Sequence, residues 1–319
     1  MGSNGKGEQM QSMLEALPSQ HLEPLWPKMS AMVPPSPNPI AIPHMWKYAD
    51  TLPHLRKAGE IVPAEDAERR VLMLVNPTMQ SPHTTDTIYA GLQLVNPDET
   101  APAHRHIAFA IRFIIEGSGF TAVEGTKMPL EQGDLVVTPT WHWHDHGNES
   151  NAPVIWLDVL NLPVFTFIRA HFAEGYGESR YPSEPRDATP WRFPWGPVAA
   201  ALDSTNKPHA IHHYCGEDGQ PLSKTLGGQA ERIAPGHTTE PSRESCSFIY
   251  HCYRGRGKTT IEPPSGKTMV FHWASRDTFA VPAWSRIRHV NEDNAETAYL
   301  VAVSDRPLLV NLGLLRPEP

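Results

Sequence analysis

Five of the 17 histidines lie between residues 101 and 150, and they are the side chains of this sequence best suited to binding a metal. They are His104, His106, His142, His144 and His146. Side chains two positions apart on a β-strand point to the same face of the sheet, so a strand at 104–106 would hold two imidazoles side by side. Neutral imidazoles are common ligands of transition metals, and such a pair provides half of a metal site.

The spacing further along the stretch selects a third ligand. Gly133 is followed at fixed intervals by Pro139, His144 and Asn148. This pattern resembles the second motif of the cupin superfamily, whose members form a double-stranded β-helix or jelly roll. Trp141 stands where that motif usually has a second glycine. The resemblance predicts His144 as the third ligand, together with the first pair.

The first motif of the superfamily is less complete here. Asp98 takes the place of its leading glycine, and the glutamate that usually follows the histidine pair is absent. The expected ligand set is therefore three histidines without a carboxylate, which leaves the full charge on a ferrous ion and favours an anionic, chelating substrate. We expect His146 to orient substrate or move a proton from beside the ligands, and His142 to have a packing role. The alternative is that all these imidazoles only fill a barrel core.

The elements that must position these side chains are short strands. The sequence holds 33 prolines, which disfavour long helices. Short runs rich in β-branched and aromatic residues alternate with Pro, Gly, Asn and Asp, as in an antiparallel sandwich or barrel. These runs are 71–75, 87–95, 111–115, 120–123, 135–137 and 154–160, and then 248–253, 258–261, 268–273, 278–281 and 298–303.

The second group of runs repeats the first. An offset of about 138 to 143 residues superposes Gly117 on Gly255 and Trp141 on Trp284, and it sets Ser242, Glu244 and Ile287 against the three ligands. The scaffold recurs without the ligands. We predict an all-β bicupin of two jelly-roll barrels with short N-terminal and linker helices, the first barrel binding a metal and the second not. His251, His272 and His289 match neither motif and are expected to be structural.

The predicted organisation has four parts. Residues 1–65 form an N-terminal arm with short helices, 66–165 the metal-binding cupin domain, 166–205 a connector, and 206–319 the second cupin domain. A net charge of −8 argues against nucleic acid as a partner. No apolar run approaches the length of a membrane helix or a signal core, and three cysteines without tight spacing suit a reducing compartment. We expect a cytoplasmic protein that uses neither membrane nor nucleic acid.

Segments along most of the chain resemble the gentisate and salicylate 1,2-dioxygenases, a family that includes 1-hydroxy-2-naphthoate dioxygenase. They are 25–27, 43–48, 67–72, 89–93, 103–106, 141–148 and 304–309. The resemblance implies a bicupin, commonly a tetramer, that binds Fe(II) in the catabolism of aromatic acids. Members insert both atoms of O2 between the carboxyl-bearing and hydroxyl-bearing ring carbons. The substrate's carboxylate and phenolate oxygens would chelate iron opposite the three histidines.

The resemblance also implies the residues around the substrate. Gln93 and Arg112 would hold its oxygens, Tyr89 would line the pocket, and Arg69 or Arg70 would guard it. Asp158 would pair with His146 beside the metal. Arg112 also shares strand alternation with His104 and His106, so an arginine is expected on the metal face, where it can pair with a carboxylate. The alternative for Arg112 is a structural ion pair within the barrel.

One departure from the family bears on the substrate. Family members typically have glutamine two residues after the histidine pair, where this chain has Ala108. Strand alternation predicts that Ala108 faces inward and makes the pocket wider and less polar. We expect a 5-substituted salicylate such as 5-nitrosalicylate, or gentisate. The three histidines alone leave open another metal-dependent cupin enzyme, such as a β-diketone dioxygenase or an isomerase, and a non-catalytic bicupin that binds small acids.

Overall fold

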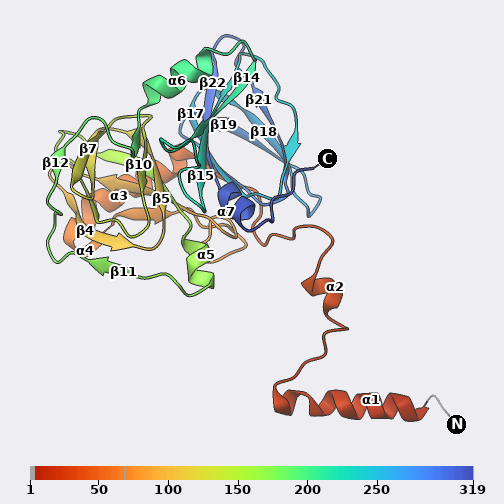
Figure 1. The fold of residues 1–319 in the computed structure, drawn as a ribbon. Helices are drawn as coiled ribbons and strands as arrows, with labels where there is room; N and C mark the ends of the chain where they lie inside the picture. Colours follow the sequence, from red (N-terminus) through yellow and green to blue (C-terminus); the bar gives the residue numbers. More distant parts are fainter. Residues whose placement is uncertain (1–3, 68, 319) are drawn as a thin grey trace. The chain divides into compact units, whose positions relative to one another are not determined.

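The chain divides into two compact units, Met1–Asn38 and Pro39–Pro319. The structure, a computed structural model, describes residues 4–67 and 69–318. The first unit contains α1 (Asn4–Ala16), the 3-10 helix η1 (Pro18–Gln20) and α2 (Met29–Met32). All the strands belong to the second unit, which holds the two barrels (Figure 1).

The N-terminal barrel consists of two facing six-stranded sheets, drawn from orange to green in Figure 1. One sheet has the order β13-β8-β5-β10-β3-β2, and the other has the order β11-β4-β9-β6-β7-β12. Neighbours in space are often distant in sequence, as expected for a jelly roll. The strands are β2 (Val71–Met73), β3 (Tyr89–Val95), β4 (Thr100–His106), β5 (Ala110–Glu116), β6 (Gly119–Val123), β7 (Thr126–Leu130), β8 (Leu135–Thr138), β9 (His144–Gly147), β10 (Val154–Leu160), β11 (Ala173–Gly175), β12 (Glu184–Pro185) and β13 (Arg192–Phe193).

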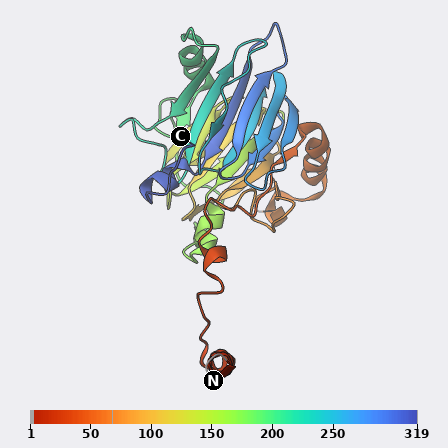
Figure 2. The same ribbon diagram turned by 90° about the vertical axis from the view of Figure 1, so that its right-hand side faces the viewer.

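The C-terminal barrel repeats this plan with sheets of order β1-β20-β17-β22-β15-β14 and β16-β21-β18-β19. Figure 2 shows strands of the larger sheet side by side. The strands are β1 (His44–Trp46), β14 (His209–Tyr214), β15 (Gly227–Ile233), β16 (Ser242–Arg243), β17 (Phe248–Arg254), β18 (Arg256–Glu262), β19 (Met269–Ala274), β20 (Thr278–Val281), β21 (Arg286–Asn291) and β22 (Ala298–Ser304). The expectation of an all-β chain with two barrels and short helices is confirmed.

The helices of the second unit are short and lie between strands. They are α3 (Tyr48–Ile61), α4 (Ala64–Ala67), α5 (Leu162–Phe167), α6 (Trp195–Asp203) and α7 (Arg306–Asn311). His44–Trp46 form the strand β1 just before α3, and this strand pairs with β20. A segment early in the sequence thus completes a sheet of the C-terminal barrel.

The two barrels share one apolar core between the sheet that contains β5 and the sheet that contains β22. Ile111, Phe113 and Ile115 of β5 are buried there with Val301 and Val303 of β22. Because side chains alternate along a strand, the intervening positions of β5 face the interior of the N-terminal barrel. This explains why almost all of β3, β5 and β10 is buried, and it gives the wall of the N-terminal barrel a rigid backing.

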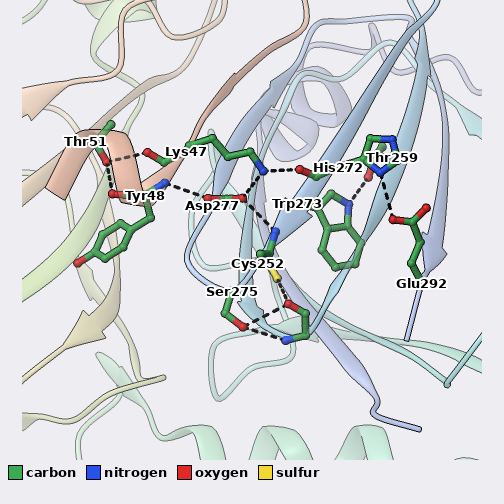
Figure 3. Close-up of polar contacts among 12 residues, drawn as sticks. Lys47, Tyr48, Thr51, Cys252, Thr259, His272, Trp273, Ser275, Asp277 and Glu292 are labelled. Carbon is green, nitrogen blue, oxygen red and sulfur yellow. Dashed lines mark hydrogen bonds and ion pairs between the residues drawn. The ribbon is translucent and has the colours of Figure 1, made fainter. Parts of the chain in front are cut away.

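Asp277 ties the start of α3 to the C-terminal barrel (Figure 3). Its Oδ1 accepts the Tyr48 backbone N–H at 2.9 Å, and its Oδ2 lies 2.8 Å from Lys47 Nζ. A carboxylate at a helix N-terminus satisfies a free amide and opposes the helix dipole favourably. The Tyr48 hydroxyl donates to Glu116 Oε1 of the N-terminal barrel at 3.0 Å. The first turn of α3 therefore links both barrels.

At the two motif positions where this sequence lacks the usual glycine, the backbone keeps a conformation that favours glycine. Asp98 has φ of 62° and Trp141 has φ of 63°. Trp284, which the repeat superposes on Trp141, has φ of 61°. This left-handed region costs a non-glycine residue about 1–2 kcal/mol. The motif geometry is thus retained in both barrels although the glycines are not.

Candidate metal centre

Three histidines meet on the inner face of the sheet that contains β4 and β9. His104 and His106 come from β4, and His144 is directly opposite His104 in the β4–β9 register. One potential ligand atom from each lies within 4.8 Å of the others. The ring centroids of His104 and His144 are 4.1 Å apart, and those of His106 and His144 are 4.8 Å apart. Across the part of the chain that the structure describes, no other group of three potential ligands is this close.

Each of these imidazoles is held by a backbone carbonyl at Nδ1. The acceptors are the oxygens of Pro102 (3.2 Å), Ala108 (2.7 Å) and His142 (2.9 Å) for His104, His106 and His144 respectively. A carbonyl can only accept, so in His106 and His144 Nδ1 carries the proton and Nε2 offers its lone pair. No described group bonds to the buried Nε2 of His144. These two rings therefore have the tautomer that metal ligation needs, whereas the Arg69 guanidinium, which can only donate, contacts both ring nitrogens of His104.

The environment also keeps these rings neutral. Burial, together with the charge of Arg69, lowers the pKa of His104 to about 2. Burial and the charge of Arg112 lower the pKa of His106 to about 4, and burial places the pKa of His144 well below its usual value. A metal cation competes with a proton for the same lone pair, so imidazoles that resist protonation are prepared to bind one. The donor set thus fits a divalent transition metal.

Arg69 and Arg70 have different surroundings. The Arg69 guanidinium lies against the His104 ring and donates to the Pro102 carbonyl at 2.8 Å. Arg70 is buried and forms two hydrogen bonds with Glu99, at 2.6 and 2.9 Å. Of the two candidates for guarding the site, Arg69 lies beside a metal-facing histidine and Arg70 is held in an ion pair.

Arg112 extends from the opposite sheet and is 4% exposed. Its Nε lies 2.8 Å from Asp158 Oδ1, and its Nη1 donates to Thr138 Oγ1 at 2.6 Å. Asp158 is directly opposite Arg112 in the β5–β10 register. Burial raises the pKa of the Asp158 carboxyl, and the neighbouring guanidinium opposes that change. The ion pair fixes the guanidinium where its charge lowers the pKa of His106.

Tyr89 and Gln93 lie on β3, and the alternation of a strand places them on one face with Gly91 between them. A side-chain carbon at Gly91 would lie 2.7 Å from the Tyr89 hydroxyl, so the glycine makes room for that group. Burial and the charge of Asp158 raise the pKa of Tyr89, which keeps its hydroxyl protonated. Gln93 is buried, and its Nε2 has no partner among the described groups.

His146 differs from the expectation in its partner. Its Nδ1 lies 2.9 Å from Thr121 Oγ1, and its Nε2 has no partner among the described residues. Asp158 instead binds Arg112 and accepts from Trp156 Nε1 at 3.1 Å. The expected pairing of Asp158 with His146 is wrong, because the β5–β10 register sets the carboxylate against the arginine.

Ala108 is fully buried but lies in the bend between β4 and β5. Side chains do not alternate regularly through a bend, so the alternation along β4 does not show that Ala108 faces inward. The same applies to Arg112, which faces the histidines because its strand belongs to the opposite sheet. His142 bonds to the Thr140 carbonyl at 3.0 Å and lies outside the ligand cluster.

Three residues near the site were not predicted. Thr121 and Thr138 bond to His146 and Arg112, as described above. The His171 ring lies 6.4 Å from the His106 ring, on the segment just before β11. The two threonines lie in predicted strands or beside a motif proline, but only the register shows which side chains they meet.

The histidines of the C-terminal barrel do not assemble. His251 Nδ1 bonds to Thr278 Oγ1 at 2.9 Å, and His289 Nδ1 bonds to Thr259 Oγ1 at 2.7 Å. His272 is exposed and faces Glu292. Each of these three histidines has a separate local partner.

None of the described helices is long and apolar enough to span a membrane.

Comparisons with known proteins agree with this geometry. A family model described as a cupin domain matches residues 91–160, which include all three histidines. The chain is 33% identical over 94% of its length to a gentisate 1,2-dioxygenase of Aquipseudomonas alcaligenes, covering 93% of that protein. It is 31% identical over 97% of its length to a 5-aminosalicylate 1,2-dioxygenase of Comamonas sp., covering 90% of that protein. The crystal structure of a salicylate 1,2-dioxygenase from Pseudoaminobacter salicylatoxidans with gentisate superposes with a TM-score of 0.88, at 27% identity, over 97% of this chain and 93% of that one.

Proposed function

The chain belongs to the gentisate and salicylate 1,2-dioxygenase family of ring-cleaving bicupin enzymes, and from that premise we propose that it uses Fe(II) to cleave a 5-substituted salicylate. We favour 5-nitrosalicylate as the substrate, with gentisate as the alternative. The bond broken joins the carboxyl-bearing and hydroxyl-bearing ring carbons, and both atoms of O2 enter the product. The observation that carries the proposal is the three-imidazole cluster facing a buried arginine across the barrel.

We assign iron to His104, His106 and His144. The hydrogen bonds from each Nδ1 to a backbone carbonyl fix the ring orientations, which supports this assignment. An imidazole set without a carboxylate suits ferrous iron and leaves its charge available to an anionic substrate. When bound, iron supplies the electronic path between the aromatic ring and O2.

The chain's own residues would then bind and orient the acid. Arg112 is already fixed by Asp158 and Thr138, so its remaining N–H groups are preorganised to donate to a substrate carboxylate. Gln93 has an unpartnered amide N–H group for a second oxygen. Tyr89 would contact the ring from the neighbouring strand.

We propose that His146 handles a proton. Thr121 holds its Nδ1, and its Nε2 is free of described partners. Burial lowers the pKa of His146 well below its usual value, which keeps the ring neutral and leaves Nε2 able to accept a hydrogen bond from a phenolic hydroxyl. Asp158 would act indirectly by fixing Arg112, and Arg69 would shield the side of His104.

The ring substituent is inferred from Ala108. A glutamine would offer an amide partner to a 5-hydroxyl group, whereas a methyl group offers none. The relatives described above are named for gentisate and for 5-aminosalicylate, so position 5 of the ring is where named substrates in this family differ. Ala108 lies beside the ligand His106, whose Nδ1 bonds its carbonyl at 2.7 Å, and its methyl group is fully buried, which supports a less polar substituent at that position.

Steady-state assays on one iron-loaded preparation test the proposal. Salicylate, gentisate, 5-nitrosalicylate and 5-chlorosalicylate would be compared by O2 consumption and by the absorbance of the ring-cleavage product. We expect the highest kcat/KM with a nitro or halo group at position 5. A clear preference for gentisate would overturn the substrate assignment, and constant O2 with all four would overturn the reaction for these acids.

We also propose a homo-oligomer, with a tetramer as the specific expectation from the family. We further propose that the chain divides into an N-terminal arm, two cupin domains and a connector between them, with boundaries at residues 65, 165 and 205. Size-exclusion chromatography with light scattering tests the first, and limited proteolysis tests the second.

A further inference from the structure

The C-terminal barrel contains a cavity with a volume of about 500 Å³. Its wall includes buried polar side chains from strands of both sheets. Glu231 (2% exposed) comes from β15, Tyr250 (2%) from β17 and His289 (3%) from β21. Arg243 and Arg286 also line it, in contact with Glu318. No ligand of the proposed reaction accounts for this cavity, which lies in the other barrel from the three histidines.

Strand registers show that the cavity occupies the position of the N-terminal site. In the N-terminal barrel, Gly91 pairs with Asp158, which pairs with Arg112. In the C-terminal barrel, Gln229 pairs with Ala302, which pairs with Tyr250. Tyr250 therefore stands where the first barrel has Arg112. Two residues beyond Gln229, Glu231 stands where the first barrel has Gln93.

One pair of side chains is the same in both barrels. Thr259 pairs with His289 as Thr121 pairs with His146, and the hydroxyl-to-Nδ1 contacts measure 2.7 and 2.9 Å. Trp273 Nε1 also donates to Thr259 Oγ1, at 2.8 Å (Figure 3). The Nε2 of His289 has no partner among the described groups although it is buried. A polar atom in this state calls for a ligand or water.

The charged groups at the floor of this cavity differ from those at the same position in the N-terminal barrel. The N-terminal barrel sets an arginine against an aspartate there, whereas the C-terminal barrel has Tyr250, Ala302 and a glutamate, Glu231, that faces a histidine instead of an arginine. Glu231 receives hydrogen bonds from Gln229 Nε2 at 2.7 Å and pairs with His209 Nε2 at 2.9 Å, and no described Lys or Arg is paired with it. Burial opposes its ionisation, but the hydrogen bond from His209 and the nearby His289 outweigh burial and lower the pKa of Glu231 to about 2.

The three arginines of the cavity lie against two of its carboxylates. Arg243 and Arg286 lie 3.2 and 3.5 Å from Glu318, and Arg306 lies 3.2 Å from Glu244. Glu231 and Glu240 also line the cavity, so the lining holds four carboxylates and three guanidinium groups. A buried anion is stabilised by a cation that comes within hydrogen-bond distance.

We propose that the C-terminal barrel is a second ligand site, which binds a small organic cation with its ammonium group against Glu231. An aromatic carboxylate, the ligand type of the first barrel, would meet a like charge there. The two barrels would thus use one scaffold for ligands of opposite sign.

Calorimetric titration of the metal-loaded protein with n-butylammonium, n-butanol and n-butyrate tests this site. We expect saturable binding of n-butylammonium that weakens in high salt, and no comparable heat from n-butanol. Glu231→Gln should weaken n-butylammonium binding by about tenfold or more. Glutamine is the residue that the fold carries at this position in the first barrel. The matched control is Glu217→Gln, which removes the same charge from an exposed turn outside the cavity and should leave binding unchanged.

A second variant guards against a folding defect. Ile211→Trp fills the cavity from an exposed lining position and keeps Glu231, and it should also weaken binding. Thermal unfolding followed by circular dichroism would establish that each variant is folded. Three outcomes would overturn the proposal: no binding of n-butylammonium at millimolar concentration, equal binding by the Glu231→Gln variant, or binding of n-butyrate that is lost in Arg286→Ala.

Discussion

Arg112 and Asp158 form a buried ion pair across neighbouring strands whose residues are far apart in sequence, with 2.8 Å between Nε and Oδ1. Thr138 on a third strand accepts from the same guanidinium. Three strands of one sheet thus fix an arginine opposite the three histidines of the other sheet. Because the ion pair already restricts the guanidinium, less conformational entropy is lost when a substrate binds.

Arg112→Lys should lower kcat/KM by about 10- to 100-fold, because an ammonium group cannot bond Asp158, Thr138 and a substrate carboxylate in the same geometry. Steady-state kinetics with the best salicylate measures this effect. Arg192→Lys is the matched control, since it changes a comparable ion pair with Asp134 at 2.7 Å on the edge strand β13. If both variants retain full activity, Arg112 has only a structural role.

His144→Ala should abolish metal binding and ring cleavage, because the remaining two imidazoles lack the third corner of the site. Metal content per chain, measured by mass spectrometry after dialysis, is the primary measurement. His142→Ala is the control, since it removes an imidazole two residues away that bonds only a local carbonyl. Full metal content in the His144 variant would contradict the assignment.

Ala108→Gln should shift selectivity toward gentisate, because the amide offers a partner to a 5-hydroxyl group and takes up space. We expect the ratio of kcat/KM for gentisate to that for 5-nitrosalicylate to rise by about tenfold, as for one hydrogen bond. The ratio is measured with both acids on the same preparation. An unchanged ratio would remove Ala108 from the determinants of specificity.

Gly91→Ala should impair the site through Tyr89. The added carbon would lie 2.7 Å from the Tyr89 hydroxyl and 2.6 Å from Val71 Cγ1, so both side chains must move. Overpacking of this kind costs about 1–3 kcal/mol in the free energy of unfolding. Urea unfolding and KM are the measurements. Gly175→Ala is the control, because nothing lies within 4 Å of its added carbon, and it should change neither.

The carboxyl group of Asp305 should make the free energy of unfolding fall as the pH rises. Burial raises its pKa to about 6 in the folded protein, against a usual value of 3.8. The folded state then binds this proton more tightly than the unfolded chain, so its stabilising effect is full below pH 3.8 and is lost as the pH rises through 6. The difference is on the order of 3 kcal/mol.

Asp305→Asn isolates that contribution. Asparagine can still accept from the Ser247 N–H group and contact Thr87, the two described partners of the carboxylate. The free energy of unfolding in urea should therefore decline less between pH 4 and pH 7 in the variant than in the parent. Parallel curves for the two proteins would mean that Asp305 is not the group responsible.

Much of the ligand set could be predicted from sequence, because it depends on local spacing. Two histidines lie two residues apart on one strand, and a proline lies five residues before the third histidine. This spacing predicts that the three imidazoles meet. The repeat was predictable for the same reason, and the similar φ angles of Trp141 and Trp284, 63° and 61°, agree with it.

The partners of Asp158 and His146 could not be predicted, because they depend on register between strands. Alternation along one strand says which face a side chain takes, but not which residue of another strand it meets. The bend at Ala108 likewise interrupts the alternation that the prediction assumed. The short strand β9 and the early strand β1 were missed because neither is an apolar run.

The shared core behind β5 and β10 means that distance from the metal is a poor guide to which positions tolerate mutation. Ile111 and Val159 support Arg112 and Asp158 from the far side of the same strands, and Val301 of the other barrel packs against that support. A screen for lost ring cleavage should therefore recover substitutions deep in the C-terminal half. Attempts to transplant the N-terminal barrel alone would have to supply a substitute for that backing surface.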